Sequence, residues 1–192
     1  MSQASQDSAK KLLASTGLPE NFLNSLLVES DWSFVIKLHA LFEAVLASLI
    51  VKKLGAPALQ DVITNLEFNN AKAGKVSFAQ ALDLLDSREA AFLSGLSELR
   101  NRLVHDVRNV QFDLRAYVTN MDANQRKSFK SQFGRAILGL PDGEAEYTRL
   151  LREHPSRIIY FAAYSFLLVL EFKVSNQRRN MLIEAVMKHA KR

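Results

Sequence analysis

The chain has 192 residues, of which 48% are hydrophobic, and a formal net charge of +5 at pH 7. A chain of this size can bury one sizeable core, so we expect a single domain over residues 1–192. Cysteine is absent, which excludes disulfides and thiolate metal sites and is typical of a reducing cytoplasm. Residues 1–8 are polar, lack the apolar stretch of a signal peptide, and are expected to be disordered.

The longest apolar run, Ile158 to Leu170, is expected to be a buried core helix and not a membrane span. It is too short to cross a bilayer, and Arg157, Glu171 and Lys173 lie at its ends. The positive net charge would favour approach to an acidic partner such as RNA. The basic residues are spread along the chain and form no stripe, so charge alone does not identify such a partner.

Helical periodicity accounts for most of the first half of the chain. Ser30 and Asp31 are suitable N-cap residues for the first long helix, and Gly55 followed by Pro57 ends it. The helices predicted here are Ala9–Ser15, Glu20–Val28, the long amphipathic Trp32–Leu54, Pro57–Glu67 and Ser77–Leu85.

Two capping boxes mark helices in the second half. Asp86 with Glu89 opens a helix over Ser87–His105, and Asp122 with Gln125 opens one that runs to Ile137. Between them, Asp113 could cap a short helix, while the alternation at residues 110–114 also allows a short strand. A short helix over Glu144–Arg152 and a long C-terminal helix within residues 155–191 complete an all-α chain.

One constellation could carry chemistry: Arg100, Asn101 and His105, at the end of the helix Ser87–His105. On a helical wheel, Phe92, Leu96, Leu99 and Leu103 form the core stripe, which Leu93, Val104 and Val107 widen to one side. Arg100 falls on this widened apolar face, where a charge needs an anion or several acceptors. Asn101 and His105 are four residues apart and share the opposite face.

Structural roles are open for the same residues. Arg100 could pair with Glu43 or Glu98, and His105 with Asp106 could cap the end of the helix. His39 and Glu43 are four residues apart and could begin a metal site, but no second histidine pair or carboxylate cluster supports one. We therefore expect an ordinary side-chain pair there, with no metal and no cofactor.

The pattern Arg100-Asn101-x-x-x-His105 resembles the R-polar-x-x-x-H signature of the HEPN superfamily. Within that superfamily the layout looks most like the mannitol-operon repressor group. The points of similarity are the chain length, the Phe-Glu-Ala-Val segment Phe42–Val45, the Ser77–Leu85 segment, the His105-Asp106 ending and a closing apolar helix. The resemblance covers residues 30–118 and extends only weakly into the C-terminal third.

The resemblance implies a single helical bundle of HEPN type, with long antiparallel helices and short flanking ones. Catalytic HEPN proteins are metal-independent endoribonucleases of toxin and defence systems, with a composite site between two protomers. The resemblance assigns proton transfer or phosphate binding to His105, charge stabilisation to Arg100 and positioning to Asn101, with Glu43 and Asp106 as accessory residues. The implied partners are a second copy, RNA and an antitoxin protein, in the cytoplasm.

Repressor-like members are not generally regarded as nucleases, which leaves a second hypothesis open. In it, the chain is a non-catalytic helical regulator of transcription that acts through a regulatory partner protein, and the motif serves dimer or ligand contacts. A third hypothesis is that Arg100 and His105 bind a small anion without chemistry.

Overall fold

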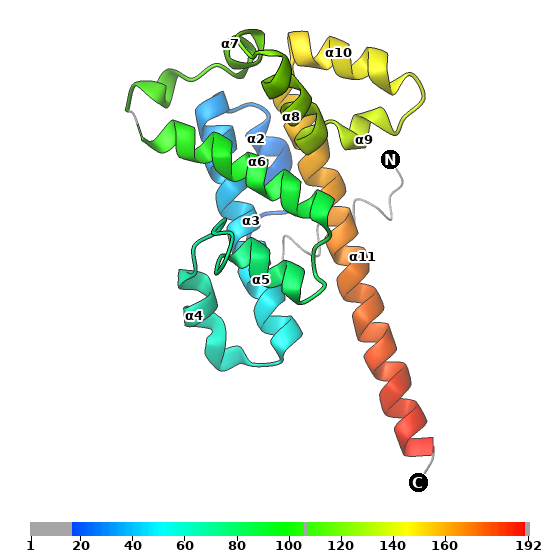
Figure 1. Ribbon diagram of the computed structural model, residues 1–192. Coiled ribbons are helices and arrows are strands. Elements are labelled where there is room, and N and C mark those ends of the chain that lie inside the picture. The colour runs from blue at the N-terminus through cyan, green and yellow to red at the C-terminus, as the bar shows by residue number, and fades with distance from the viewer. Residues whose placement is uncertain (1–16, 106, 191–192) are drawn as a thin grey trace.

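The computed structural model describes residues 17–105 and 107–190, with the side chains of the last helix described as far as Lys173. Within these ranges the chain is all-helical and contains no strand (Figure 1). The predicted all-α class is confirmed. The expected disorder of residues 1–8, the predicted helix Ala9–Ser15 and the accessory residue Asp106 lie outside the described residues.

The first long helix forms as predicted. The Ser30 hydroxyl accepts a hydrogen bond from the backbone N–H of Ser33, and Gly55, with φ of 63°, ends the helix in the left-handed conformation. The elements of this half are α2 (Phe22–Leu26), α3 (Asp31–Leu54), the 3₁₀ turn η1 (Pro57–Leu59), α4 (Gln60–Asn65) and α5 (Lys75–Ala81).

The helix that carries the motif is α6 (Ser87–Val104). Its capping box is present: the Asp86 carboxylate accepts from the backbone N–H of Glu89, and the Glu89 carboxylate accepts from that of Asp86. The 3₁₀ turn η2 (Val107–Gln111) and α7 (Leu114–Thr119) follow. Asp113 caps α7, so the helical alternative for this segment is the one observed, and the strand is not.

The last third contains α8 (Ala123–Phe133), α9 (Arg135–Leu138), α10 (Gly143–Glu153) and α11 (Pro155–Ala190). The predicted continuous helix to Ile137 is divided into α8 and α9 at Gly134. A Cβ on Gly134 would lie 3.0 Å from the Tyr147 ring and 2.7 Å from the Lys130 carbonyl oxygen. The division therefore coincides with a close approach of α10 that leaves no room for a side chain.

Four phenylalanine rings join the longest helices at the centre of the molecule. The Phe92 ring of α6 lies 5.2 Å from that of Phe42 on α3, 5.3 Å from that of Phe166 on α11 and 5.9 Å from that of Phe133 on α8, between centroids. Contacts at these separations stabilise aromatic pairs beyond the area that they bury. The cluster fixes how α6 sits against α3 and α11.

The finer expectation, a bundle of long antiparallel helices, is not confirmed. Figure 1 shows α6 crossing α3, with α4 and α5 at one end of the molecule and α7 to α10 gathered around the first part of α11 at the other. The second part of α11 projects beyond this body. One side of α6 is exposed towards its C-terminal end, from Glu98 to His105.

By length and composition, two helices of the described part of the chain could cross a membrane: α3 and residues Pro155–Lys173 of α11. Burial supports a core role for α3, since 67% of its most apolar window lies inside the molecule, against 39% for that of α11. The apolar run Ile158–Leu170 is therefore part of a longer apolar segment, Pro155–Lys173, which is long enough to cross a membrane. Its residues Ile158, Ile159 and Leu167 are nevertheless fully buried.

Candidate functional site

The orientation of α6 places the motif at the surface. Leu99 and Leu103 are buried against the core, which confirms the predicted stripe, and Asn101 and His105 are exposed on the other side. The widened apolar face is only partly confirmed, because Leu93 is buried whereas Val104 is 42% exposed. Hydrophobic burial on one side of α6 thus presents Asn101 and His105 to solvent on the other.

Arg100 is partly buried and contacts its neighbour in the motif. Its Nη1 donates a hydrogen bond to Asn101 Oδ1 over 3.1 Å. Within the described part of the chain, no ion pair joins Arg100 to Glu43 or Glu98, so neither predicted partner is observed. Its guanidinium offers five N–H donors and is always charged. A partly buried cation without a carboxylate partner is suited to binding an anion.

Lys75 occupies the position that Arg100 could have taken beside Glu43. Its Nζ lies 2.7 Å from Glu43 Oε1 and also donates to the backbone carbonyls of Thr64 and Leu66, over 2.8 and 2.7 Å. The side chain has no exposed surface, and these three acceptors use all of its protons. Glu43 thereby joins α3 to α5 through Lys75. Its accessory role at the motif stays a prediction.

His39 lies beside this ion pair. Its Nδ1 is 3.9 Å from Glu43 Oε2, its ring packs edge-on against Phe68 at 4.5 Å, and its Nε2 is buried without a hydrogen-bond partner. The pKa of His39 is lowered to about 4, chiefly by burial; the charge of Glu43 opposes this shift, and the positive charges of Arg100 and Lys75 add to it. The imidazole is therefore neutral at pH 7, and the pair is an ordinary one, as expected.

His105 is the C-cap residue of α6, in a right-handed helical conformation. The side-chain amide of Asn109 donates to the Arg102 carbonyl oxygen over 2.8 Å and satisfies one of the free carbonyls at this end of the helix. The position of His105 thus agrees with the capping role considered from the sequence. Its ring remains exposed at the same time.

Glu98 and Arg102 extend the exposed side of α6. Residues 98, 101, 102 and 105 follow the i, i+3, i+4, i+7 spacing that places side chains on one face of a helix, and all four are exposed. The Arg102 guanidinium lies over the Tyr117 ring of α7, 5.2 Å from its centroid. Asn101 and His105 are therefore continuous with a surface that α7 flanks.

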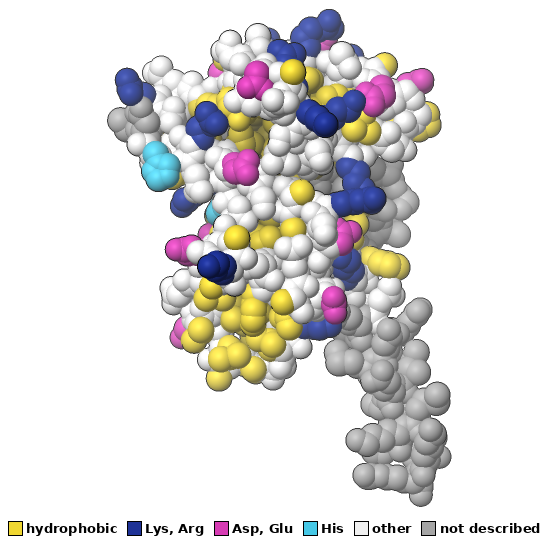
Figure 2. Space-filling view, viewed as in Figure 1, with side chains coloured by type: hydrophobic (Ala, Val, Ile, Leu, Met, Phe, Trp, Pro, Cys, Tyr) yellow, Lys and Arg dark blue, Asp and Glu magenta, His cyan; other side chains and the backbone are white. Residues whose placement is uncertain are grey.

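A groove of about 150 Å³ borders this surface, between α6 and the α7–α8 pair. Its floor is apolar and comes from buried side chains, and its rim carries polar side chains that are exposed or partly exposed. The floor contains Leu99, Met121, Phe129 and Phe133, and the rim contains Glu98, Arg102, Tyr117, Gln125, Ser128 and Gln132. Figure 2 shows apolar side chains within the depression and charged ones around it.

Neither the groove nor the burial of Lys75 was predicted from the sequence. The groove joins residues of α6 to residues of α8 about 30 positions later in the chain. The sequence signal for this contact is Gly95, a glycine within the helix. A Cβ on Gly95 would lie 2.6 Å from Gln132 Cδ and 3.0 Å from Phe133 Cζ, so the glycine allows the two helices to approach closely. Lys75 follows a polar loop and has no pattern that distinguishes it from a solvated lysine.

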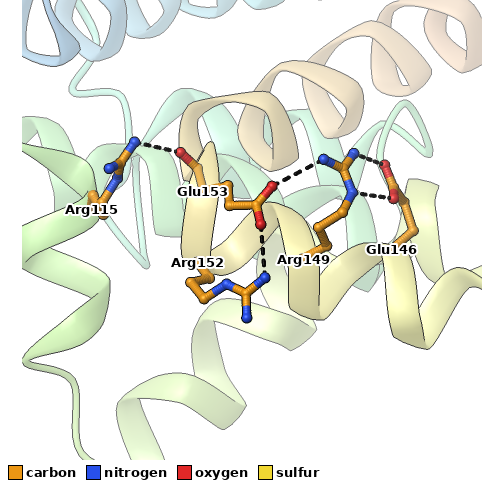
Figure 3. A network of polar contacts seen from close by, with 5 residues as sticks. All are labelled: Arg115, Glu146, Arg149, Arg152 and Glu153. Atoms are coloured by element: carbon orange, nitrogen blue, oxygen red, sulfur yellow. Dashed lines mark hydrogen bonds and ion pairs between the residues drawn. The ribbon is translucent and has the colours of Figure 1, made fainter.

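The largest concentration of charged hydrogen bonds lies elsewhere, on α10 (Figure 3). Arg149 bonds the Glu146 and Glu153 carboxylates, Arg152 bonds Glu153, and Arg115 of α7 donates to the Glu153 carbonyl oxygen. The hydrogen bond from Arg149 lowers the pKa of Glu146. Because these charges satisfy one another and join α7 to α10, the network is structural. Arg149 and Arg152 thus have carboxylate partners, whereas the hydrogen bond of Arg100 is to the neutral amide of Asn101.

The described residues contain no group of three or more histidine or acidic side chains that could hold a metal ion. A search of family models, of curated proteins and of solved structures finds no match to the chain. The features that bear on function are therefore the motif, the exposed side of α6 at its C-terminal end and the groove beside it.

Proposed function

We propose that the protein is a metal-independent RNA endonuclease whose site is formed by two copies of the chain. The proposal extends the resemblance to HEPN proteins and carries with it a homodimer, an RNA substrate and a place in the cytoplasm. The observation that supports it best is the exposed end of α6, where His105 and Asn101 face solvent beside Arg100.

In the proposed reaction, the ribose 2′-hydroxyl attacks the adjacent phosphorus. A bond forms between O2′ and phosphorus, the bond from phosphorus to O5′ breaks, and the products carry a 2′,3′-cyclic phosphate and a 5′-hydroxyl. One proton leaves O2′ and one reaches O5′. His105 of one copy accepts the first and His105 of the other donates the second, which is general acid–base catalysis.

Arg100 and Asn101 act on the phosphate in this scheme. Negative charge grows on the non-bridging oxygens during attack, and a guanidinium fixed beside them stabilises the transition state more than the ground state. The hydrogen bond from Arg100 to Asn101 restricts the guanidinium before substrate arrives. Preorganised donors of this kind avoid reorganisation at the moment of reaction.

The test is cleavage of labelled total RNA in EDTA by the wild type and by His105→Ala. Positioned acid–base groups contribute about 10²- to 10⁴-fold, so we expect His105→Ala to lose at least about 10²-fold in rate. His154→Ala is the matched control, because His154 is also an exposed histidine at the C-cap of a helix, on α10. The wild type and this control should leave cyclic-phosphate ends at equal rates.

Two results would contradict the proposal. Equal cutting by the wild type and His105→Ala would mean a contaminating nuclease and would remove the motif from the reaction. No cutting by folded, dimeric wild type would favour the second hypothesis, a regulator that binds another protein.

One surface supports that second hypothesis. Leu54, Leu59 and Val62 are exposed at the end of α3, on η1 and on α4, at 36%, 38% and 59%, and Figure 2 shows apolar side chains gathered at this end of the molecule. Contiguous exposed apolar side chains mark protein interaction sites. A regulatory protein is the partner that this hypothesis proposes, whereas an antitoxin partner belongs to the nuclease hypothesis.

A further inference from the structure

The groove between α6 and the α7–α8 pair can hold a flat ring. Its volume is about 150 Å³, and a cavity of about that size accommodates one benzene molecule. The floor is made of buried apolar side chains, Phe129 and Phe133 among them, which suit the face of an aromatic ring. A six-membered ring fits this space, whereas a two-ring purine would extend beyond it.

The rim can recognise the polar edge of such a ring. The side chains of Glu98, Ser128 and Gln132 make no hydrogen bond to the part of the chain that the structure describes. Gln125 uses its side-chain oxygen in the capping box of α8, which leaves its two amide protons for another acceptor. The groove thus offers donors and acceptors above a small apolar floor.

The groove is also adjacent to the proposed reaction. Glu98 and Arg102 belong to its rim and share one face of α6 with Asn101 and His105. Arg102 is held over the Tyr117 ring, and guanidinium planes and aromatic rings are the usual stacking partners of unpaired RNA bases. A nucleotide with its phosphate at His105 would have its base directed along this face.

We propose that the groove is a subsite for one pyrimidine base of single-stranded RNA, next to the phosphate that is cut. The inference rests on the proposed function for its link to cleavage, but base binding can be measured without it. It predicts that binding prefers uracil and cytosine over adenine, and that any cleavage occurs beside pyrimidines.

Tetranucleotides with 2′-O-methyl riboses test the subsite, because they present bases and phosphates but lack the attacking hydroxyl. We expect the wild-type protein to bind the uridine and cytidine tetramers about tenfold more tightly than the adenosine tetramer, the effect of about one stacked base. Equal affinity for the three tetramers would overturn the pyrimidine assignment. Fluorescence anisotropy at one fixed salt concentration measures all three.

A matched pair of substitutions tests the location. Ser128→Trp places a large side chain in the groove, whereas Ser131→Trp places it on the same helix α8 outside the lining. Both positions are exposed, so both variants should fold. We expect Ser128→Trp to lose the pyrimidine preference and bind the uridine tetramer about tenfold more weakly, and Ser131→Trp to match the wild type. Equal binding by the two variants would overturn the location.

The two proposals fail separately. Loss of tetramer binding in Ser128→Trp, with no cleavage by the wild type, would support the subsite and contradict the nuclease. Cleavage that requires His105 but is unchanged in Ser128→Trp would support the nuclease and contradict the subsite.

Discussion

The partners of each charged residue distinguish structural groups from candidate functional ones. Lys75 is completely buried and saturated by Glu43 and two carbonyl groups. Arg100 is only partly buried and bonds a neutral amide. A buried cation must be paired because an unpaired one costs several kcal/mol, so Lys75 cannot serve a substrate without disrupting the fold. Arg100 can bind an anion at no such cost.

At this scale, the environment of His39 predicts how stability depends on pH. Burial lowers its pKa from 6.5 to about 4 in the folded state, so the unfolded chain binds a proton more readily between these values. The free energy of unfolding is therefore unaffected by His39 above pH 6.5 and decreases as pH falls from 6.5 towards 4. From pH 7 to pH 5 we expect a loss of about 2 kcal/mol.

Urea unfolding of the wild type and His39→Phe at pH 7 and pH 5 measures this loss. Phenylalanine can keep the edge-on packing against Phe68 but does not titrate. The pH-dependent loss should therefore be about 2 kcal/mol smaller in the variant. An identical loss in both proteins would show that His39 is protonated in the folded state at pH 5.

Residue types and spacing predicted the exposed pair Asn101 and His105 but not the partner of Arg100. Helical periodicity determines which side of α6 faces the core. It says nothing of which cation reaches Glu43, because Lys75 lies 32 positions away and arrives there through the fold. Long-range ion pairs between ordinary lysines and glutamates leave no local pattern.

Among the elements, capping residues predicted where helices begin, and tertiary contacts decided where one is interrupted. Asp86, Asp113 and Asp122 each accept hydrogen bonds at the start of α6, α7 and α8, because their carboxylates satisfy free N–H groups there. The break between α8 and α9 lies at Gly134, where the Tyr147 ring of α10, which follows later in the chain, packs closely. Local sequence does not contain that contact.

The first residue of α10 provides an element-scale prediction. A Cβ on Gly143 would lie 2.4 Å from the Ile137 carbonyl oxygen and 2.9 Å from Leu138 Cα. These are backbone atoms that cannot rotate away, so α9 and α10 would have to separate. We expect Gly143→Ala to destabilise the protein by about 1–3 kcal/mol in urea unfolding, as overpacking does.

Gly139→Ala is the control for this substitution. Its Cβ would be 3.6 Å from the nearest such atom, the Arg135 carbonyl oxygen, which is an ordinary contact. The change in stability should stay within about 0.5 kcal/mol. If both alanine variants were equally stable, α9 and α10 would not be packed as closely as the structure places them.

For the whole molecule, the proposed composite site predicts how mixed dimers behave. If each site needs His105 from two copies, a wild-type chain paired with a His105→Ala chain has an incomplete site. Adding an excess of His105→Ala protein should therefore suppress cleavage by the wild type as chains exchange. His154→Ala, added in the same amount, should leave the rate unchanged.

Cleavage assays after co-incubation, with the dimer verified by sedimentation, measure this suppression. Wild-type activity that persists unchanged in an excess of His105→Ala would mean that one chain is sufficient for catalysis. The composite site would then be wrong even if His105 itself is required.

The arrangement of the helices was the least predictable level. Their class and most of their starting residues follow from periodicity and caps, but the crossing of α6 over α3 depends on how the Phe42, Phe92 and Phe166 rings pack. Packing geometry of this kind is determined by shapes that meet only in the folded state. The groove follows from that crossing, which is why no motif revealed it.

The complete burial of Lys75 has a practical consequence. Amine-reactive reagents modify accessible lysines such as Lys37 and Lys127 at once, because both are exposed. The amine of Lys75 can be acylated only when its bonds to Glu43, Thr64 and Leu66 break together. Its labelling rate, followed by mass spectrometry, therefore reports how often the segment between α4 and α5 opens in the native protein.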